Sequence, residues 1–218
     1  MGEAVLGEVK AKEAIARLIK EYPDAKYYLN FNTPLELMVA AIISAQTKDA
    51  VVNSVTQQLF KKYKTPEAYS DADEGELAKD ISRVAFPLNK ARNIIKACRL
   101  LLEKHGGSVP KDMESLIALP GIGRKTANTI LINAFGIVEG IPVDTWVIRV
   151  PGRIGLTKSN DPELIEHDLM RLVDKSHWHN IAYVFKEHGH KVCQSRIPIC
   201  SKCIINDICK RNGVAKSK

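Results

Sequence analysis

Apolar residues recur every three or four positions along most of the chain, which is the spacing of helices that bury one face. The first such pattern covers residues 7–22 and must end before Pro23, because proline restricts the residue ahead of it. Strand-like alternation is nearly absent, and no motif repeats at a fixed period. We therefore predict an all-α fold, with helices in residues 7–22, 35–45, 51–63, 74–84, 90–105, 113–119, 127–135, 160–173 and 181–188.

The segment that follows residue 32 carries several signals of a helix start at once. Thr33 can cap the helix, Pro34 fits its first turn, and Glu36 stands three residues after the cap. The residues through Ala45 are almost entirely apolar, so this helix should be buried on nearly all sides. Polar residues begin abruptly at 44–49. They form either a functional loop or the N-terminal cap of the next helix.

Two connections in the first half of the chain contain proline. Around Pro66 the sequence is polar, and we predict a linker there. Residues 85–88, Ala-Phe-Pro-Leu, put apolar side chains into a turn at Pro87. Such side chains either wedge into a DNA base stack or pack into the protein core. The core is their commoner place, so we expect Phe86 and Leu88 to be buried.

A glycine hairpin joins two of the predicted helices. Gly121 and Gly123 permit a tight turn and the close approach of another backbone. The N–H groups at the start of the next helix favour an anion, and a nucleic-acid phosphate is the obvious one. Gly121, Gly123, Arg124 and Thr126 are therefore candidate DNA-binding residues. The simpler interpretation is a helix C-cap followed by a loop.

Lys125 lies in the first turn of the helix after this hairpin. The positive end of the helix dipole and the adjacent Arg124 both disfavour its protonated form. A neutral amine is a nucleophile, so Lys125 is a candidate for covalent catalysis. The alternative is an ordinary lysine that is solvated or contacts a phosphate.

Asp144 ends a loop and stands just before an apolar segment that begins at Val147. This position suits a carboxylate that caps the N-terminus of a helix. A functional carboxylate is the alternative, and the sequence pattern leaves both interpretations open.

The composition favours a polyanionic partner. The 218 residues are enough for one large or two small domains, and 32 Lys and Arg against 25 Asp and Glu give a net charge of +7. No apolar run is long enough to span a membrane, and the N-terminus lacks the pattern of a signal peptide. We therefore expect a cytoplasmic protein.

Four of the five cysteines crowd near the C-terminus with the spacing C-x6-C-x2-C-x5-C. In a reducing compartment this density indicates metal ligands rather than disulfides. Thiolates hold either a structural zinc ion or an iron–sulfur cluster, and the ligand type alone does not separate the two. Cys98 should simply pack in the core. The predicted metal ligands are Cys193, Cys200, Cys203 and Cys209.

Four segments together resemble the endonuclease III family of DNA glycosylases with AP-lyase activity, part of the helix-hairpin-helix/Gly-Pro-Asp superfamily. They are residues 43–49 (ISAQTKD), residues 119–128 (LPGIGRKTAN), residues 142–145 (PVDT) and the cysteine spacing. The resemblance covers nearly the whole chain in the family's order. Trp146, where many relatives have histidine, and the 85–88 loop depart from the family pattern and bear on base preference.

The resemblance implies two helical domains with the active site in the cleft between them. A six-helix domain containing the helix-hairpin-helix would cover residues 27–136. Residues 1–26 together with 137–218 would form the second domain, including a cluster loop at 193–209. The four cysteines would then hold a [4Fe-4S] cluster.

The resemblance also implies the chemistry of base excision repair. Lys125 would attack C1′ of a flipped-out nucleotide, while Asp144 stabilises the positive sugar and assists proton transfer. Gln46 would fill the space that the nucleotide leaves in the duplex. A Schiff base and β-elimination would follow, cutting the strand 3′ to an oxidised pyrimidine of the thymine glycol type. The expected partner is double-stranded DNA with a damaged base or an abasic site, bound by a monomer associated with the nucleoid.

Two other functions are considered. A monofunctional mismatch or uracil glycosylase would leave an intact abasic site instead of a cut strand. A non-catalytic DNA-binding module would use the hairpin and the cluster only as a clamp. The presence of both Lys125 and Asp144 argues against the second.

Overall fold

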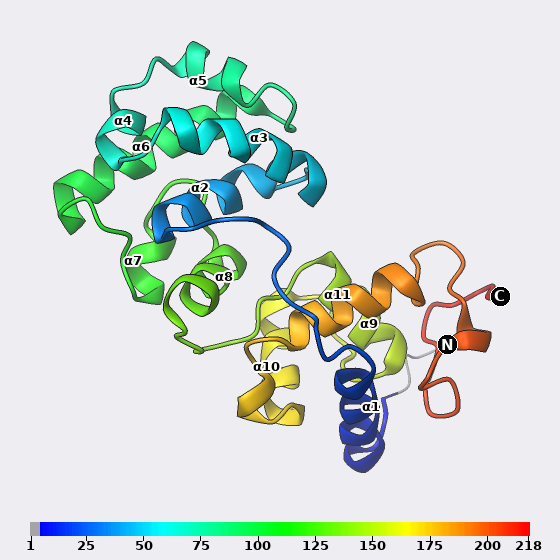
Figure 1. Ribbon diagram of the computed structural model, residues 1–218. Helices are drawn as coiled ribbons and strands as arrows, with labels where there is room; N and C mark the ends of the chain where they lie inside the picture. Colours follow the sequence, from blue (N-terminus) through cyan, green and yellow to red (C-terminus); the bar gives the residue numbers. More distant parts are fainter. Residues whose placement is uncertain (1–4) are drawn as a thin grey trace. The chain divides into compact units, whose positions relative to one another are not determined.

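All regular structure in residues 5–218, the part of the chain that the computed structural model describes, is helical (Figure 1), and the predicted all-α fold is confirmed. Two short 3-10 segments, Lys175–His177 and Cys200–Lys202, accompany the α-helices. The α-helices are α1 (Glu8–Glu21), α2 (Pro34–Ser44), α3 (Asp49–Lys62), α4 (Pro66–Ser70), α5 (Glu74–Asp80), α6 (Pro87–His105), α7 (Met113–Ile117), α8 (Arg124–Phe135), α9 (Thr145–Ile154), α10 (Pro162–Leu172) and α11 (Ile181–Lys191).

Contacts between residues divide these helices into two compact units, which are described separately. One unit comprises Tyr28–Ile137, and the other combines the described residues up to Tyr27 with Val138–Lys218. Across the described part of both units, no helix is long and apolar enough to cross a membrane.

The first unit, Tyr28–Ile137, is organised around α2. This helix packs against α3, α6 and α8, and its residues 37–43 are all buried, as predicted. Its start also follows the prediction, since the Thr33 hydroxyl accepts the N–H of Glu36 at 3.1 Å and Pro34 is the first helical residue. A helix that is apolar on all sides can serve as a core only when other helices surround it.

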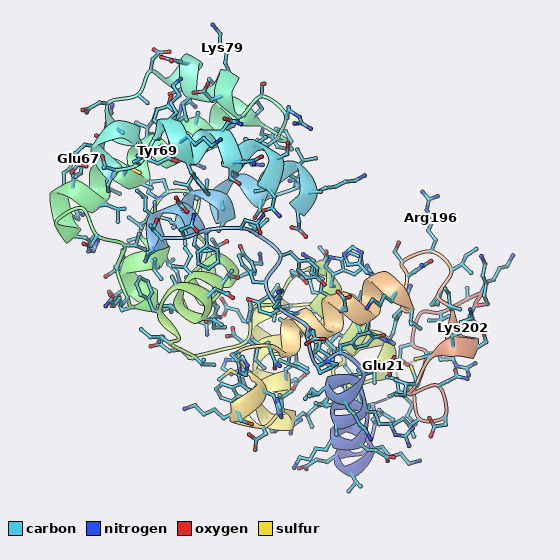
Figure 2. The ribbon with its side chains drawn as sticks, in the orientation of Figure 1. Glu21, Glu67, Tyr69, Lys79, Arg196 and Lys202 are labelled. Atoms are coloured by element: carbon cyan, nitrogen blue, oxygen red, sulfur yellow. The ribbon has the colours of Figure 1, made fainter. Side chains whose placement is uncertain are left out.

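The prediction of a linker around Pro66 is wrong, because these residues form the short helix α4. Thr65 caps this helix by accepting the N–H of Ala68 at 3.3 Å. Tyr69, a residue of the helix, is buried. The helix packs on α6 (Figure 2 labels Tyr69 beside it). Five residues are too few to show a helical period in sequence, so burial of Tyr69 against α6 decides the conformation.

The expectation that Phe86 and Leu88 are buried is also wrong. Their side chains are 63% and 50% exposed, respectively. The backbone of Phe86 is left-handed, with φ 55°, and Pro87 is already the first residue of α6 rather than part of a turn. Val84 and Ala91, on either side of this bend, fill the core instead. The bend therefore leaves two apolar side chains in solvent.

The second unit is built from α1, α9, α10 and α11. α9 packs on α11, and α1 packs on both α10 and α11. Pro151 falls in the last turns of α9, which ends at Gly155 in a left-handed conformation (φ 93°). The chain after α11 has little regular structure and carries the four clustered cysteines. The core of this unit includes Leu18, Val150, Ile165, Val184 and Phe185.

Candidate functional site

The structure places the predicted hairpin between α7 and α8, and Gly121 is required there for two reasons. Its φ of 84° lies in the left-handed region, which residues with a Cβ rarely adopt. A Cβ at this position would also lie 3.2 Å from Cβ of Asn93 and 3.3 Å from Cγ2 of Ile42. The side chain of Ile122 is buried and so fixes the hairpin to the core of its own unit, Tyr28–Ile137. The turn is thus shaped by the core of its own unit.

Gly123 has a different reason to be glycine. It is the N-cap of α8 with an ordinary extended backbone, and a Cβ would meet no atom within 4 Å. Packing within the protein therefore does not require glycine here. Gly123 is exposed, so the close approach of an external backbone is a physical reason for a residue without a side chain. The N-terminus of α8 behind it favours an anion such as a phosphate.

Lys125 is exposed in the first turn of α8, beside exposed Arg124 and half-buried Thr126. The next turn holds the helix in place, since Ala127 and Ile130 are completely buried. The backbone carbonyl of Lys125 also accepts the hydroxyl of Thr129 at 2.9 Å. Lys125 is therefore an exposed residue on a helix that is anchored in the core.

Asp144 caps α9, as the simpler interpretation of the sequence predicted. Its Oδ1 accepts the N–H of Trp146 at 2.8 Å and that of Val147 at 3.0 Å. Both hydrogen bonds end on the same oxygen, and the side chain is only half-buried. One carboxylate oxygen, Oδ1, is thus fixed by the start of the helix, and Oδ2 accepts neither of these two N–H groups.

Gln46 lies in the turn between α2 and α3. It is exposed, and its backbone is left-handed with φ 54°. The polar residues at 44–49 therefore form a turn of their own, and α3 begins within it at Asp49. Gln46, Lys125 and the hairpin glycines all belong to the unit Tyr28–Ile137, whereas Asp144 belongs to the other unit.

The structure brings the four clustered cysteines to one small pocket. Cys193, Cys200, Cys203 and Cys209 line it together with apolar residues of α9 and of the C-terminal segment. Burial raises the pKa of Cys203 to about 11 and also raises the pKa of Cys209, with the other thiols of the group adding to both shifts. Burial of this kind disfavours the thiolate form of a cysteine unless a metal binds its sulfur.

Several hydrogen-bond donors surround the cysteine sulfurs. Nη1 of Arg153 lies 3.6 Å from Sγ of Cys193, and the backbone N–H of Arg211 lies 3.4 Å from Sγ of Cys209. Nε2 of His188 lies 3.6 Å from Sγ of Cys203, a contact that the local sequence pattern around this histidine does not predict. Donors of this kind stabilise negative charge on metal-bound thiolates.

The residue types in the pocket are those of two kinds of metal centre. Within residues 5–218, no three His, Cys, Asp or Glu side chains converge closely enough to hold one metal ion. A structural zinc needs four ligands at about 2.0–2.3 Å from one point. A cluster of several irons reaches sulfurs that are farther apart, because each cysteine binds a different iron. Both kinds of centre use cysteine thiolates, so the ligand type of this pocket does not by itself separate zinc from an iron–sulfur cluster.

Basic residues accompany the cysteine segment. Arg196 and Lys202 extend from it into solvent, and Figure 2 shows Arg196 projecting outward. Their charge complements a thiolate-ligated centre and suits an approaching phosphate backbone.

Trp146, the residue that departs from the family pattern beside Asp144, is held in a stack. Its ring centroid lies 4.0 Å from that of His190, and the guanidinium of Arg149 lies 4.3 Å from the indole. A Cβ at Gly189 would come within 2.5 Å of the indole ring, so this glycine makes room for it. The sequence pattern marks Trp146 as a departure from the family but does not show what accommodates it, because Gly189 and His190 lie on α11, far along the chain.

Comparison with known proteins agrees with these observations. The model of the HhH-GPD superfamily of base excision DNA repair proteins matches residues 39–175. Endonuclease III of Synechocystis sp. is 44% identical over 200 residues, which cover 92% of this chain and 91% of that protein. Endonuclease III of Escherichia coli (strain K12) is 38% identical over 211 residues, which cover 94% of this chain and 97% of that protein.

Solved structures show the same similarity in three dimensions. A structure described as a trapped endonuclease III–DNA covalent intermediate matches with a TM-score of 0.91 at 38% identity, covering 95% of this chain and 97% of that chain. A thermostable thymine-DNA glycosylase, at 22% identity and a TM-score of 0.83, shares the fold. The chain therefore belongs to the endonuclease III family of DNA glycosylases with AP-lyase activity, within the HhH-GPD superfamily of base excision DNA repair proteins.

Proposed function

We propose that this protein excises oxidised pyrimidines of the thymine glycol type from double-stranded DNA and then cuts the strand 3′ to the lesion. The observation that carries the proposal is Lys125, an exposed amine in the first turn of α8 directly after an exposed glycine hairpin. A glycosylase that only releases bases needs an activated water and no amine at this place. A DNA-contacting amine can form a covalent bond to the sugar.

The reaction begins when the unprotonated amine of Lys125 attacks C1′ of the damaged nucleotide. The bond from C1′ to the base breaks, and the base leaves with that electron pair and takes up a proton. The sugar ring then opens to give a Schiff base between Nζ and C1′. Loss of a proton from C2′ expels the 3′ phosphate by β-elimination, and water finally releases the lysine.

Asp144 assists the first step through its carboxylate. As the bond to the base breaks, positive charge develops at C1′, and a nearby carboxylate lowers the energy of that state. The same group accepts the proton that the attacking amine loses. Because the α9 N–H groups bind Oδ1, the carboxylate is oriented before substrate arrives.

Three further features would hold the DNA. Gly121 and Gly123 let the phosphate backbone approach α8, where Arg124 and Thr126 contact it. Gln46 occupies the space that the flipped nucleotide leaves in the duplex. The net charge of +7 favours the encounter with DNA. We propose that the protein acts as a monomer on duplexes with a damaged base or an abasic site.

We also propose that Cys193, Cys200, Cys203 and Cys209 hold a [4Fe-4S] cluster. The shared pocket and the donors around the sulfurs support this ligand set. When bound, the cluster supplies a fixed cross-link for the C-terminal segment. The two compact units would be the family's two domains, residues 27–136 and residues 1–26 with 137–218.

Borohydride trapping tests the role of Lys125. Borohydride reduces a Schiff base to a stable bond, so the wild-type protein should become covalently attached to duplex DNA that contains thymine glycol or an abasic site. Lys125→Gln should lose the adduct while it still binds the DNA. Lys79→Gln, which changes an exposed lysine that projects from α5 (Figure 2), is the matched control and should trap normally.

Two results would contradict the proposal. Adducts that persist in Lys125→Gln would assign the nucleophile to another residue. Base release that leaves an intact abasic site in the wild type would identify a monofunctional mismatch or uracil glycosylase instead.

A further inference from the structure

Lys90 is a buried cation at the C-terminal end of α2. Its side chain comes from the first turn of α6 and is only 5% exposed. Nζ donates to the carbonyl of Ile43 at 2.8 Å, to the carbonyl of Ala45 at 2.5 Å and to the hydroxyl of Thr47 at 3.1 Å. Burial lowers the pKa of Lys90. An ammonium nevertheless has three N–H donors for these three acceptors and lies at the negative end of the helix dipole.

Two of these acceptors flank Gln46 directly. Ala45 and Thr47 are both bound to Lys90, and the residue between them carries the left-handed backbone. A residue with a Cβ adopts this conformation at an energetic cost, and it persists only where the surroundings fix it. The Gln46 side chain itself is exposed. Lys90 therefore fixes the backbone on both sides of Gln46, whose side chain is exposed to solvent.

Thr47 connects the Lys90 ammonium to the exposed loop that contains Phe86. Its hydroxyl accepts the N–H of Ala85 at 3.1 Å, next to Phe86. The N–H of Lys90 in turn donates to the carbonyl of Phe86 at 3.1 Å. Within residues 5–218, left-handed residues other than glycine are Gln46, Phe86 and Arg211, so two of the three adjoin this hydrogen-bonded group. Both present an exposed side chain.

We propose that Lys90 is a positioning residue for the nucleotide-flipping step. It holds the turn of Gln46 and the loop of Phe86 in fixed positions, from which both side chains enter the duplex together. The inference rests on the proposed role of Gln46 in filling the vacated space. Lys90 itself is buried and touches no DNA. Its contribution is a preorganised Gln46 turn, which lowers the cost of flipping the nucleotide.

The test compares two substrates that differ only in the need for this step. A duplex with an abasic site requires that the gap be filled, whereas a single-stranded abasic oligonucleotide has no stack to enter. Lys90→Met keeps an unbranched side chain but removes all three donors. We expect borohydride trapping of the duplex to slow between about tenfold and 100-fold, with near wild-type trapping of the single strand.

Controls separate positioning from folding. Lys96→Met changes an exposed lysine of the same helix and should trap both substrates normally. Gln46→Ala should show the same duplex-selective loss, and the Gln46→Ala/Lys90→Met double variant should lose no more than the larger single effect. If Lys90→Met does not fold, Thr47→Val removes the shared hydroxyl and should give the duplex-selective loss.

Equal losses on both substrates in these variants, or none, would overturn the role of Lys90. A different result would refute the proposed function itself. If the wild type traps neither substrate, the Schiff base is refuted. If Gln46→Ala retains full duplex trapping, the space-filling role is refuted.

Discussion

At the scale of single residues, the dual position of Asp144 is the most informative feature. The residue caps α9 through one oxygen, which is the structural role that the sequence predicted. The same contact fixes the direction of the carboxylate that we propose for catalysis. The observed structural role and the proposed chemical role therefore belong to one side chain, and one substitution can separate them.

Asp144→Asn should keep the fold and lose the reaction. The amide oxygen still accepts the N–H groups of Trp146 and Val147, so the free energy of unfolding should change by less than about 1 kcal/mol. Loss of the negative charge should slow single-turnover base release by about 100-fold or more. Urea denaturation and single-turnover kinetics on a lesion duplex measure the two quantities.

Asp161→Asn is the matched control for this experiment. Asp161 caps α10 in the same way, with Oδ1 accepting the N–H groups of Glu163 at 2.9 Å and Leu164 at 3.1 Å. Its substitution should leave base release unchanged. If Asp144→Asn is destabilised and its activity falls only in proportion to the unfolded fraction, Asp144 is a cap and no more.

At the scale of elements, the start of α6 departs most from what the sequence pattern predicts. Phe86 and Leu88 were expected in the core but are exposed, while Lys90, a charged residue, is buried. The contacts of Lys90 and the bend before it account for both observations. The lysine side chain enters the unit to bind the end of α2, and the preceding bend turns the apolar residues outward.

Phe86→Ala should slow base excision from duplex DNA without weakening the fold. The side chain is exposed, so its removal should change the free energy of unfolding by no more than about 0.5 kcal/mol. Nucleotide flipping should be slower, because the variant lacks the apolar side chain that enters the base stack. Excision rates on a lesion duplex, with denaturation as a check, measure the effect.

Leu164→Ala removes another exposed apolar side chain, on α10, and should leave excision unchanged. Equal excision rates for Phe86→Ala and the wild type would show that the exposed loop plays no part in opening the duplex.

At the scale of the whole molecule, the C-terminal segment raises the question of what keeps it folded. Beyond α11 it has one short 3-10 turn, its four thiols lie in a single pocket, and Ile205 is its buried contribution to the core of the unit. A segment with so little regular structure would gain rigidity from the proposed cluster, which would cross-link four points along it. This reasoning supports a structural role for the proposed cluster.

The purified protein should therefore absorb at about 400 nm and contain iron rather than zinc. Cys200→Ala should abolish the band and make the segment after α11 sensitive to trypsin, which cuts beside its many lysines and arginines. Cys98→Ala is the matched control, because Cys98 is completely buried in the other unit and should leave the band intact. Zinc in place of iron, without an absorbance band, would contradict the prediction.

The sequence by itself determined the helical class, the start of α2, the hairpin and the grouping of the cysteines, and it offered the Asp144 cap as one of two interpretations. These features depend on residues close in the chain, where propensity, capping and spacing act directly. The segment pattern also identified the family to which the chain belongs.

Only the tertiary structure decided the features that depend on residues far apart in the chain. Lys90 binds a turn more than forty residues earlier, Trp146 stacks on a residue of α11, and His188 reaches the sulfur of Cys203. In each case the burial or direction of a side chain is set by a partner outside its own helix. A local pattern carries no information about such a partner, because packing rather than propensity selects it.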